Sequence, residues 1–208
     1  MSGLRERKKR EKLDRIKASA WSLFQELGYE ATTTRAICQA AGIGTGTLFS
    51  YVEDKSELLV MCFGDQVMPL LDAAIAQTPD GCVERQLASV HHPLLSFYAR
   101  DLQLGRSILR NILFVQGRGR THLAGLNFQL QLHTANLLEA ARERGEISAH
   151  APIPMLAALV FGAYFSTLIA MLDNHIPNVD VATAMFEMAI KIQLDGSRPS
   201  PPTPRGAP

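Results

Sequence analysis

The sequence predicts an all-α protein of about nine helices. Apolar residues recur at intervals of three and four along most of the chain, which is the spacing of one face of an α-helix. No segment alternates apolar and polar residues as a half-buried strand does, and no internal repeat is present. The 208 residues are 47% hydrophobic and 20% charged, which is the composition of an ordinary soluble globular protein.

The chain starts with a basic segment. Residues 1–10 are charged and lack an apolar stripe, so we expect a flexible basic arm there. Up to Lys17 the chain holds eight Lys and Arg against three Asp and Glu, although the whole chain has a net charge of only +1. Positive charge gathered at one end indicates an anionic partner. A first helix follows, with apolar residues at helical spacing from Leu13 to Leu27 and Gly28 just past its end.

Two short helices joined by a tight turn come next. Thr33 or Thr34 can cap the first helix, and Gly42 ends it. The second helix runs from about Thr45 to Tyr51. This arrangement, over about residues 33–52, is typical of a helix-turn-helix, whose second helix lies in the major groove of DNA.

A fourth helix begins with a capping signal. Asp54 and Glu57 have the spacing of a capping box, and the helix continues through Ile75. Pro69 lies inside it, where we expect a kink or a break. Lys55 lies in the first turn, where backbone amides and the helix dipole favour an anion, so we expect it to contact a DNA phosphate.

The expected organisation is therefore an N-terminal DNA-binding domain over residues 11–57 and a helical body over residues 58–195. We expect a loop at residues 117–120 and a disordered Pro-rich tail at 196–208. The five remaining helices cover about residues 83–101, with an interruption near His92-Pro93, 104–115, 121–144, 152–174 and 179–194.

Other classes of protein fit the sequence poorly. Met155–Leu172 carries no charge and reaches the lower length limit for a membrane span. Its polar residues and the lack of a second span favour a buried helix, so we expect no membrane contact. Cys38, Cys62 and Cys82 have the spacing of neither a disulfide scaffold nor a zinc site. The charged N-terminus is no signal peptide. We expect a cytoplasmic protein with reduced thiols.

The sequence also shows no enzyme motif. It contains no nucleophile motif, zinc-protease motif, Walker loop or dinucleotide fingerprint. Glu84, His91 and His92 do not have the spacing of a metal site. We therefore predict no catalytic residue, no metal and no cofactor, and we keep a helical enzyme only as a remote alternative.

Residues from about 10 to 65 contain five short motifs in one order and without gaps. This order resembles the tetracycline-repressor (TetR) family of bacterial transcriptional regulators. Three residues depart from the family pattern: Gly44 replaces a common Ser, Phe49 a Tyr, and Val52 an aromatic residue. The five motifs are Gly28-Tyr29, Thr33-Thr34, Ile37 to Gly42, Gly46 to Val52, and Lys55 to Leu58.

The resemblance implies that DNA contacts are divided among these residues. Thr33, Thr34 and Tyr51 would bond phosphates, which position the protein, while side chains on base edges give specificity. Phe49 would either contact DNA or only pack within the domain. The expected base-reading residues are Arg35, Thr45, Gly46, Thr47 and Ser50.

The resemblance also implies dimerisation and ligand binding by the helical body. Helices 154–174 and 179–194 are apolar, and small residues lie four apart in the first, so we expect them to form a homodimer interface. The middle helices would enclose a pocket for a lipophilic or aromatic effector. Its candidate lining residues are Phe97, Tyr98, Phe114, His122, Phe128, His133, Tyr164 and Phe165.

The sequence thus predicts a sequence-specific DNA-binding transcriptional regulator. We expect a homodimeric repressor that a small lipophilic or aromatic ligand releases from a palindromic operator. An activator, or a regulator that needs no ligand, is consistent with the same residues.

Overall fold

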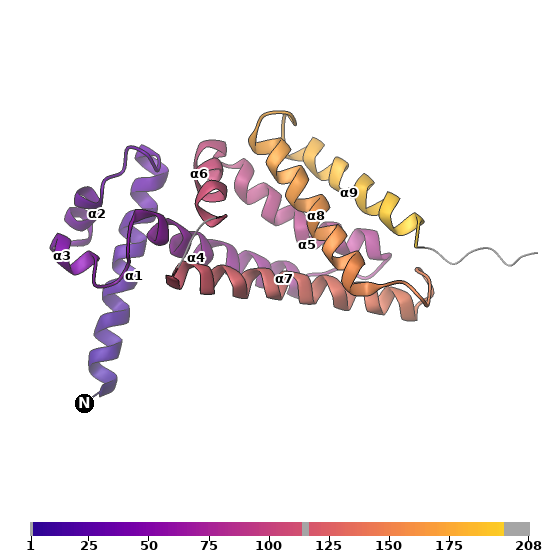
Figure 1. Ribbon diagram of the computed structural model, residues 1–208, viewed down its shortest axis with the longest axis horizontal. Helices are drawn as coiled ribbons and strands as arrows, with labels where there is room; N and C mark the ends of the chain where they lie inside the picture. The colour runs from indigo at the N-terminus through magenta and orange to yellow at the C-terminus, as the bar shows by residue number, and fades with distance from the viewer. Residues whose placement is uncertain (1, 114–116, 198–208) are drawn as a thin grey trace, which may run out of the picture. The chain divides into compact units, whose positions relative to one another are not determined.

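The computed structural model describes residues 2–113 and 117–197 (Figure 1). Within these ranges the secondary structure consists of nine α-helices and no strands, which confirms the predicted fold class. The helices are α1 Ser2–Leu27, α2 Thr34–Ala41, α3 Thr45–Leu48, α4 Lys55–Ala76, α5 Val83–Ala99, α6 Leu102–Ile112, α7 Gly117–Glu143, α8 Ile153–Leu172 and α9 Val179–Asp195.

The chain forms two compact units, each built from two segments. Unit 1 consists of residues 1–70 and 97–127, and unit 2 consists of residues 71–96 and 128–208. The expected boundary after residue 57 differs from this division. The N-terminal part of α4 packs with the helix-turn-helix because its apolar residues, among them Leu58 and Leu59, are fully buried there.

The core of unit 1 uses the apolar stripe predicted for the first helix. Of this stripe, Ile16, Ala20 and Phe24 are fully buried, one on each of the last three turns of α1, and α1 packs against α2. An aromatic cluster adds the end of α5, because Phe97 stacks on Trp21 at 6.3 Å between ring centroids and meets Phe63 at 5.8 Å. The fully buried members of the core include Ile16, Ala20, Phe24, Ile37, Leu58 and Leu59.

The core of unit 2 lies between α5, α8 and α9. His91 of α5 is buried there, with its ring centroid 5.4 Å from Tyr164 of α8 and 4.9 Å from Phe186 of α9. Aliphatic residues from α8 and α9 complete this layer, among them Val160, Leu168, Ile190 and Leu194.

Both C-terminal helices also present an apolar stripe to solvent. On α8 the stripe contains Met155, Leu159 and Ile169, which are 59%, 45% and 43% exposed. On α9 it contains Val181, Met185, Met188 and Ile192, which are 38% to 66% exposed. The α9 residues are three or four apart and the α8 residues four and ten apart, and both spacings place each set on one face of its helix.

Two helices are long and apolar enough to cross a membrane by length and composition alone. They are α4 and α8, so the expectation of a single such segment is wrong. About half of each apolar window is buried, at 56% for α4 and 44% for α8. Core helices of soluble proteins have the same properties.

Several boundaries differ from those expected. Residues 2–10 are helical rather than a flexible arm, because Lys, Arg and Glu favour helix and α1 only has to propagate into them. An Arg7–Glu11 ion pair at 3.3 Å adds local support. Residues 117–120 are the first turn of α7 rather than a loop. Neither Pro69 nor Pro93 ends its helix. Most of the expected Pro-rich tail, residues 198–208, lies outside the described residues.

Candidate nucleic-acid interface

The helix-turn-helix is fixed by its caps. Thr33 is the N-cap of α2, and its Oγ1 accepts a hydrogen bond from the Ala36 N–H at 3.1 Å. Gly42 ends α2 with φ of +65°, a left-handed conformation that favours glycine. The N-cap of α3 is Gly44, which offers no side-chain bond, and α3 ends at Leu48 rather than Tyr51. Ser50 Oγ donates to the Thr47 carbonyl at 2.7 Å in the turn that follows.

Most of the expected DNA contacts lie on the surface of this motif. Phe49 is 50% exposed, so it does not belong to the core, whereas Val52 is buried. Tyr51 is also buried, although it borders the groove described next. The exposed residues are Thr33, Arg35, Thr45, Gly46, Phe49 and Ser50, and the half-buried ones are Thr34, Thr47 and Lys55.

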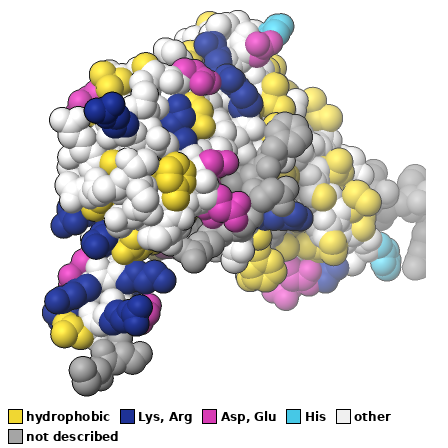
Figure 2. All heavy atoms as spheres, turned by 60° about the vertical axis from the view of Figure 1, so that its left-hand side comes forward, with side chains coloured by type: hydrophobic (Ala, Val, Ile, Leu, Met, Phe, Trp, Pro, Cys, Tyr) yellow, Lys and Arg dark blue, Asp and Glu magenta, His cyan; other side chains and the backbone are white. Residues whose placement is uncertain are grey.

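A basic groove lies beside the motif. It has a volume of about 820 Å³ and is formed by the N-terminal part of α1 together with Ser50 and Tyr51. Figure 2 shows Lys and Arg side chains gathered on this part of α1, at the lower left. Two acids, Glu6 and Glu11, also border the groove. Its basic residues are Arg5, Lys8, Lys9, Lys12 and Arg15.

Two polar contacts hold α1 in place along this groove. Arg15 Nε donates to the Ala41 carbonyl at the end of α2, at 3.0 Å. Lys17 pairs with Asp65 of α4 at 2.7 Å. The basic helix is therefore attached to the helix-turn-helix at a defined position. Composition predicted the charge of this segment, but its helical form and the groove were not predicted.

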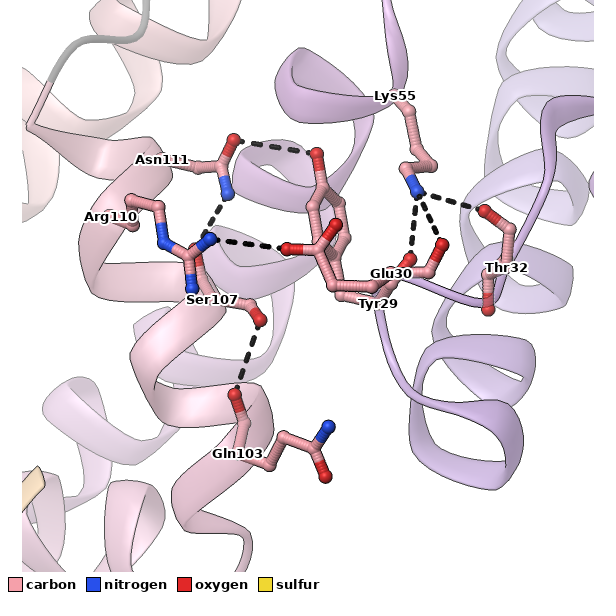
Figure 3. A network of polar contacts seen from close by, with 8 residues as sticks. All are labelled: Tyr29, Glu30, Thr32, Lys55, Gln103, Ser107, Arg110 and Asn111. Carbon is pink, nitrogen blue, oxygen red and sulfur yellow. Dashed lines mark hydrogen bonds and ion pairs between the residues drawn. The ribbon is translucent and has the colours of Figure 1, made fainter.

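Lys55 does not have the environment expected of a phosphate contact. Its Nζ donates to the backbone carbonyls of Tyr29 and Thr32 at 2.8 and 2.9 Å, with Glu30 at 3.4 Å (Figure 3). It also lies 4.2 Å from the centre of the Tyr29 ring. No local sequence pattern indicates this arrangement, because these carbonyls lie more than twenty positions away in the chain.

The same turn also contacts α6. The Tyr29 hydroxyl donates to Asn111 Oδ1 at 3.4 Å, and Glu30 pairs with Arg110 at 3.2 Å (Figure 3). Burial raises the pKa of Tyr29, so its hydroxyl keeps the proton that it donates.

The expected pocket residues fall in both units. Phe97 and Tyr98 belong to the aromatic cluster of unit 1, and Phe128 of unit 2 is 68% exposed. Three others lie in unit 2: Tyr164 is buried beside His91, Phe165 stacks on Phe161 at 6.0 Å, and His133 Nε2 lies 3.3 Å from Thr78 Oγ1. Phe114 and the side chain of His122 lie outside the described residues.

His91 is a second titratable residue whose environment the sequence did not reveal. Its Nδ1 lies 2.8 Å from the Leu87 carbonyl, while its buried Nε2 has no partner among the residues that the structure describes. Burial lowers the pKa of His91 to about 4, so the ring is neutral at pH 7. In the same parts of the chain, no three His, Cys, Asp or Glu side chains group as metal ligands.

A capped helix-turn-helix with exposed polar residues beside a basic groove defines a DNA-binding protein. Residues 16–62 match the model of the bacterial regulatory proteins of the tetR family, and no curated protein matches the sequence. Residues 16–62 therefore form a DNA-binding domain of the TetR type, as the sequence motifs predicted. The regulators of that family are non-enzymatic DNA-binding proteins, which agrees with the prediction that the chain is not an enzyme.

Solved structures show the same fold along nearly the whole chain. Thermus thermophilus FadR, a TetR-family transcriptional repressor in complex with lauroyl-CoA, has a TM-score of 0.71 and 21% identity, covering 93% of this chain and 100% of its own. Bacillus subtilis FadR in complex with stearoyl-CoA has a TM-score of 0.67 and 17% identity, covering 88% and 97%. FadR from Bacillus halodurans, a fatty acid degradation regulator, has a TM-score of 0.67 and 19% identity, and the match covers 89% of this chain and 99% of that FadR chain.

Proposed function

We propose that this regulator is a homodimeric repressor that binds a palindromic operator and leaves it when a small lipophilic ligand binds. It would act in the cytoplasm, where its operator lies. The observation that carries the proposal is the exposed polar face of α2 and α3 beside a groove of five basic side chains. The polar face can read bases, and the groove can hold the DNA backbone.

Base recognition is assigned to the exposed side of α2 and α3. Arg35 can donate two hydrogen bonds to a guanine, and Thr47 offers both a hydroxyl and a methyl group suited to thymine. Gly46 lets the backbone approach the bases, because it is exposed and nothing crowds its Cα. Thr45 and Ser50, on either side of Gly46 and Thr47 in the sequence, complete the proposed base-reading set.

Phosphate contacts are assigned to the basic groove. Lys8, Lys9 and Lys12 take part in no ion pair within the described ranges, so their charges are available to the DNA backbone. Ser50 and Tyr51 border the groove, and Thr33, Thr34 and Phe49 are further proposed contacts whose side chains are exposed or half-buried.

The exposed stripes on α8 and α9 support dimerisation. Monomeric soluble proteins rarely leave such a large contiguous apolar surface open to water. Ala158, Gly162 and Ser166 are exposed on α8 as well, and their small size lets another helix approach. A second copy related by a two-fold axis would cover these faces and place two helix-turn-helix motifs on two half-sites.

For the ligand we propose a lipophilic acyl compound. The structural neighbours in complex with lauroyl-CoA and stearoyl-CoA make acyl-CoA thioesters the first compounds to test. Among the lining residues predicted from the sequence, His133, Tyr164 and Phe165 of unit 2 are the first to replace. An activator would bind the same DNA, and a reporter gene behind the operator distinguishes the two by the direction of the change.

The test begins with a selection of bound sites from random DNA. We expect enrichment of one palindromic sequence, a dimer in sedimentation at micromolar concentration, and release of that DNA by an acyl-CoA but not by free CoA. No enriched sequence would contradict DNA recognition. A monomer would contradict the proposed assembly, and unchanged binding with acyl-CoA would contradict the proposed ligand class.

A further inference from the structure

We propose that Lys55 is a positioning residue of the DNA-binding domain: it fixes the turn before α2 and contacts no phosphate. This inference rests on the proposed function and reverses the role that sequence reasoning gives to this lysine. The turn comprises residues 28–32, between the end of α1 and the cap of α2.

The ammonium group of Lys55 has no donor left for DNA. A lysine has three N–H donors. Three carbonyl oxygens, those of Tyr29, Glu30 and Thr32, lie within 3.4 Å of Nζ. The face of the Tyr29 ring, 4.2 Å away, gives the cation further stabilisation. A phosphate contact would require this lysine to give up bonds inside its own domain.

The N-terminus of α4 is also poorly suited to a phosphate. The Asp54 carboxylate accepts a hydrogen bond from the Glu57 N–H at 2.7 Å. The Glu57 carboxylate accepts one from the Glu53 N–H at 2.7 Å. Two protein carboxylates therefore already take up the favourable position at this helix end, and they repel a further anion.

The turn held by Lys55 leads directly to α2. Gly28 has φ of +81°, which few other residues adopt. Thr32 is buried, and its hydroxyl lies within hydrogen-bond distance of the Leu23 and Gly28 carbonyls at 3.0 and 2.8 Å. The next residue, Thr33, caps α2. Because Lys55 holds the carbonyl of Thr32, its bond fixes the point at which α2 begins.

A second helix contacts the opposite side of the turn. In Figure 3, Tyr29 lies between Lys55 and Asn111 of α6. Asn111 is itself held by the Ser107 carbonyl, which accepts from Asn111 Nδ2 at 2.7 Å. A displacement of α6 would therefore pull on the same turn that Lys55 holds. The exposed Glu30–Arg110 pair adds little, because water screens it.

The salt dependence of operator binding separates the two roles of Lys55. In Lys55→Met we expect the affinity to fall roughly tenfold, because carbonyls lose charge-assisted hydrogen bonds. The slope of log K against log salt should stay unchanged, since no phosphate contact is lost. A lost phosphate contact would reduce that slope by about 0.9. Lys12→Met in the basic groove is the matched control, and its slope should fall.

Lys55→Arg provides a second variant if the Met variant folds poorly. Arginine keeps the positive charge and would restore a phosphate contact, but its planar guanidinium cannot place donors on the same three carbonyls. We expect weakened binding in this variant too, with circular dichroism showing unchanged helix content. Asn111→Leu should also weaken binding, and combined with Lys55→Met it should give less than the sum of the two effects.

The outcomes are distinguishable. Wild-type affinity in Lys55→Arg, or a reduced slope in Lys55→Met, would overturn the positioning role while DNA binding by the wild type stands. Unchanged affinity in both Lys55 variants would also overturn it. Additive effects of the Lys55 and Asn111 changes would refute the claim that both residues act through the turn of residues 28–32. Failure of the wild type to bind any selected DNA would instead refute the proposed function.

Discussion

At the scale of single residues, we expect the missing side chain of Gly46 to determine how closely α3 approaches DNA. This glycine is exposed in the second position of α3. A Cβ placed there meets no atom within 4 Å, and the backbone does not adopt a left-handed conformation. The fold therefore does not require glycine at this position, so a requirement for it would come from the partner.

Gly46→Ala tests this close approach. We expect a helix that is as stable or more stable, because alanine favours helix over glycine by up to about 1 kcal/mol. Operator affinity should nevertheless fall roughly tenfold, because the methyl group would separate backbone and bases. Gly44→Ser is the control: it adds a cap worth a few tenths of a kcal/mol and should leave the affinity unchanged. Equal operator affinity of Gly46→Ala and wild type would show that the backbone at this position does not approach the DNA bases closely.

His91 makes the stability of the protein depend on pH. Its pKa is lowered to about 4 in the folded chain by burial and is about 6.5 when unfolded. Between these values the unfolded state binds the proton first, so the stabilising effect is present above pH 6.5 and is lost as the pH falls through 4. The free energy of unfolding should drop by about 2 kcal/mol between pH 7 and pH 5 from this group alone.

Urea unfolding of wild type and His91→Leu at these two pH values measures that contribution. Leucine cannot titrate and suits the apolar contacts of His91 with Tyr164 and Phe186. The variant should therefore lose less stability on acidification than the wild type. If both proteins lost the same free energy of unfolding between pH 7 and pH 5, the pH dependence would come from groups other than His91.

At the scale of helices, the sequence predicted which elements exist better than where they end. Apolar spacing located α2 and α4, and the caps at Thr33 and Gly42 were visible as residue types. Residues 2–10 were missed because an existing helix propagates through charged residues without needing an apolar stripe. The exposed surface of α2 and α3 was predictable for the same local reasons. The role of Lys55 was not, because its partners belong to a distant turn.

The helical form of the basic segment is itself testable with Glu11. Glu11→Pro keeps every basic side chain but breaks α1, whereas Glu11→Ala removes the same carboxylate and keeps the helix. We expect the proline variant to lose operator affinity and part of its salt dependence. The alanine variant should bind at least as tightly as the wild type, since a negative charge has left the groove. A flexible arm would make the two variants bind alike.

At the scale of the whole molecule, we expect operator binding to depend on the apolar stripes of α8 and α9. A single helix-turn-helix buries little DNA surface, so two half-sites need two linked copies. The spacing of Val181, Met185, Met188 and Ile192 makes α9 the more continuous of the two faces. Sequence reasoning identified these helices as apolar, but it could not separate their buried faces from their exposed ones.

Met185→Glu tests this interface. The charge would be buried without a partner in the dimer at a cost of several kcal/mol, while in the monomer it would remain in water. We expect monomers in sedimentation at micromolar concentration and a large loss of operator affinity, with unchanged helix content. Glu187→Lys changes charge on the same helix but off the stripe, and it should remain dimeric. A dimeric Met185→Glu protein would place the interface on another surface.

The two-segment construction of unit 1 limits how freely this protein can be recombined with its relatives. The DNA-reading motif ends before residue 70, yet its unit also contains residues 97–127. Trp21 and Phe63 rest on Phe97 from that second segment. A chimera joined within α4 would therefore combine this DNA-binding motif with the end of α5 and the α6 of another protein. Exchange of operator specificity between such regulators requires that the grafted segment and its recipient match at this buried aromatic cluster.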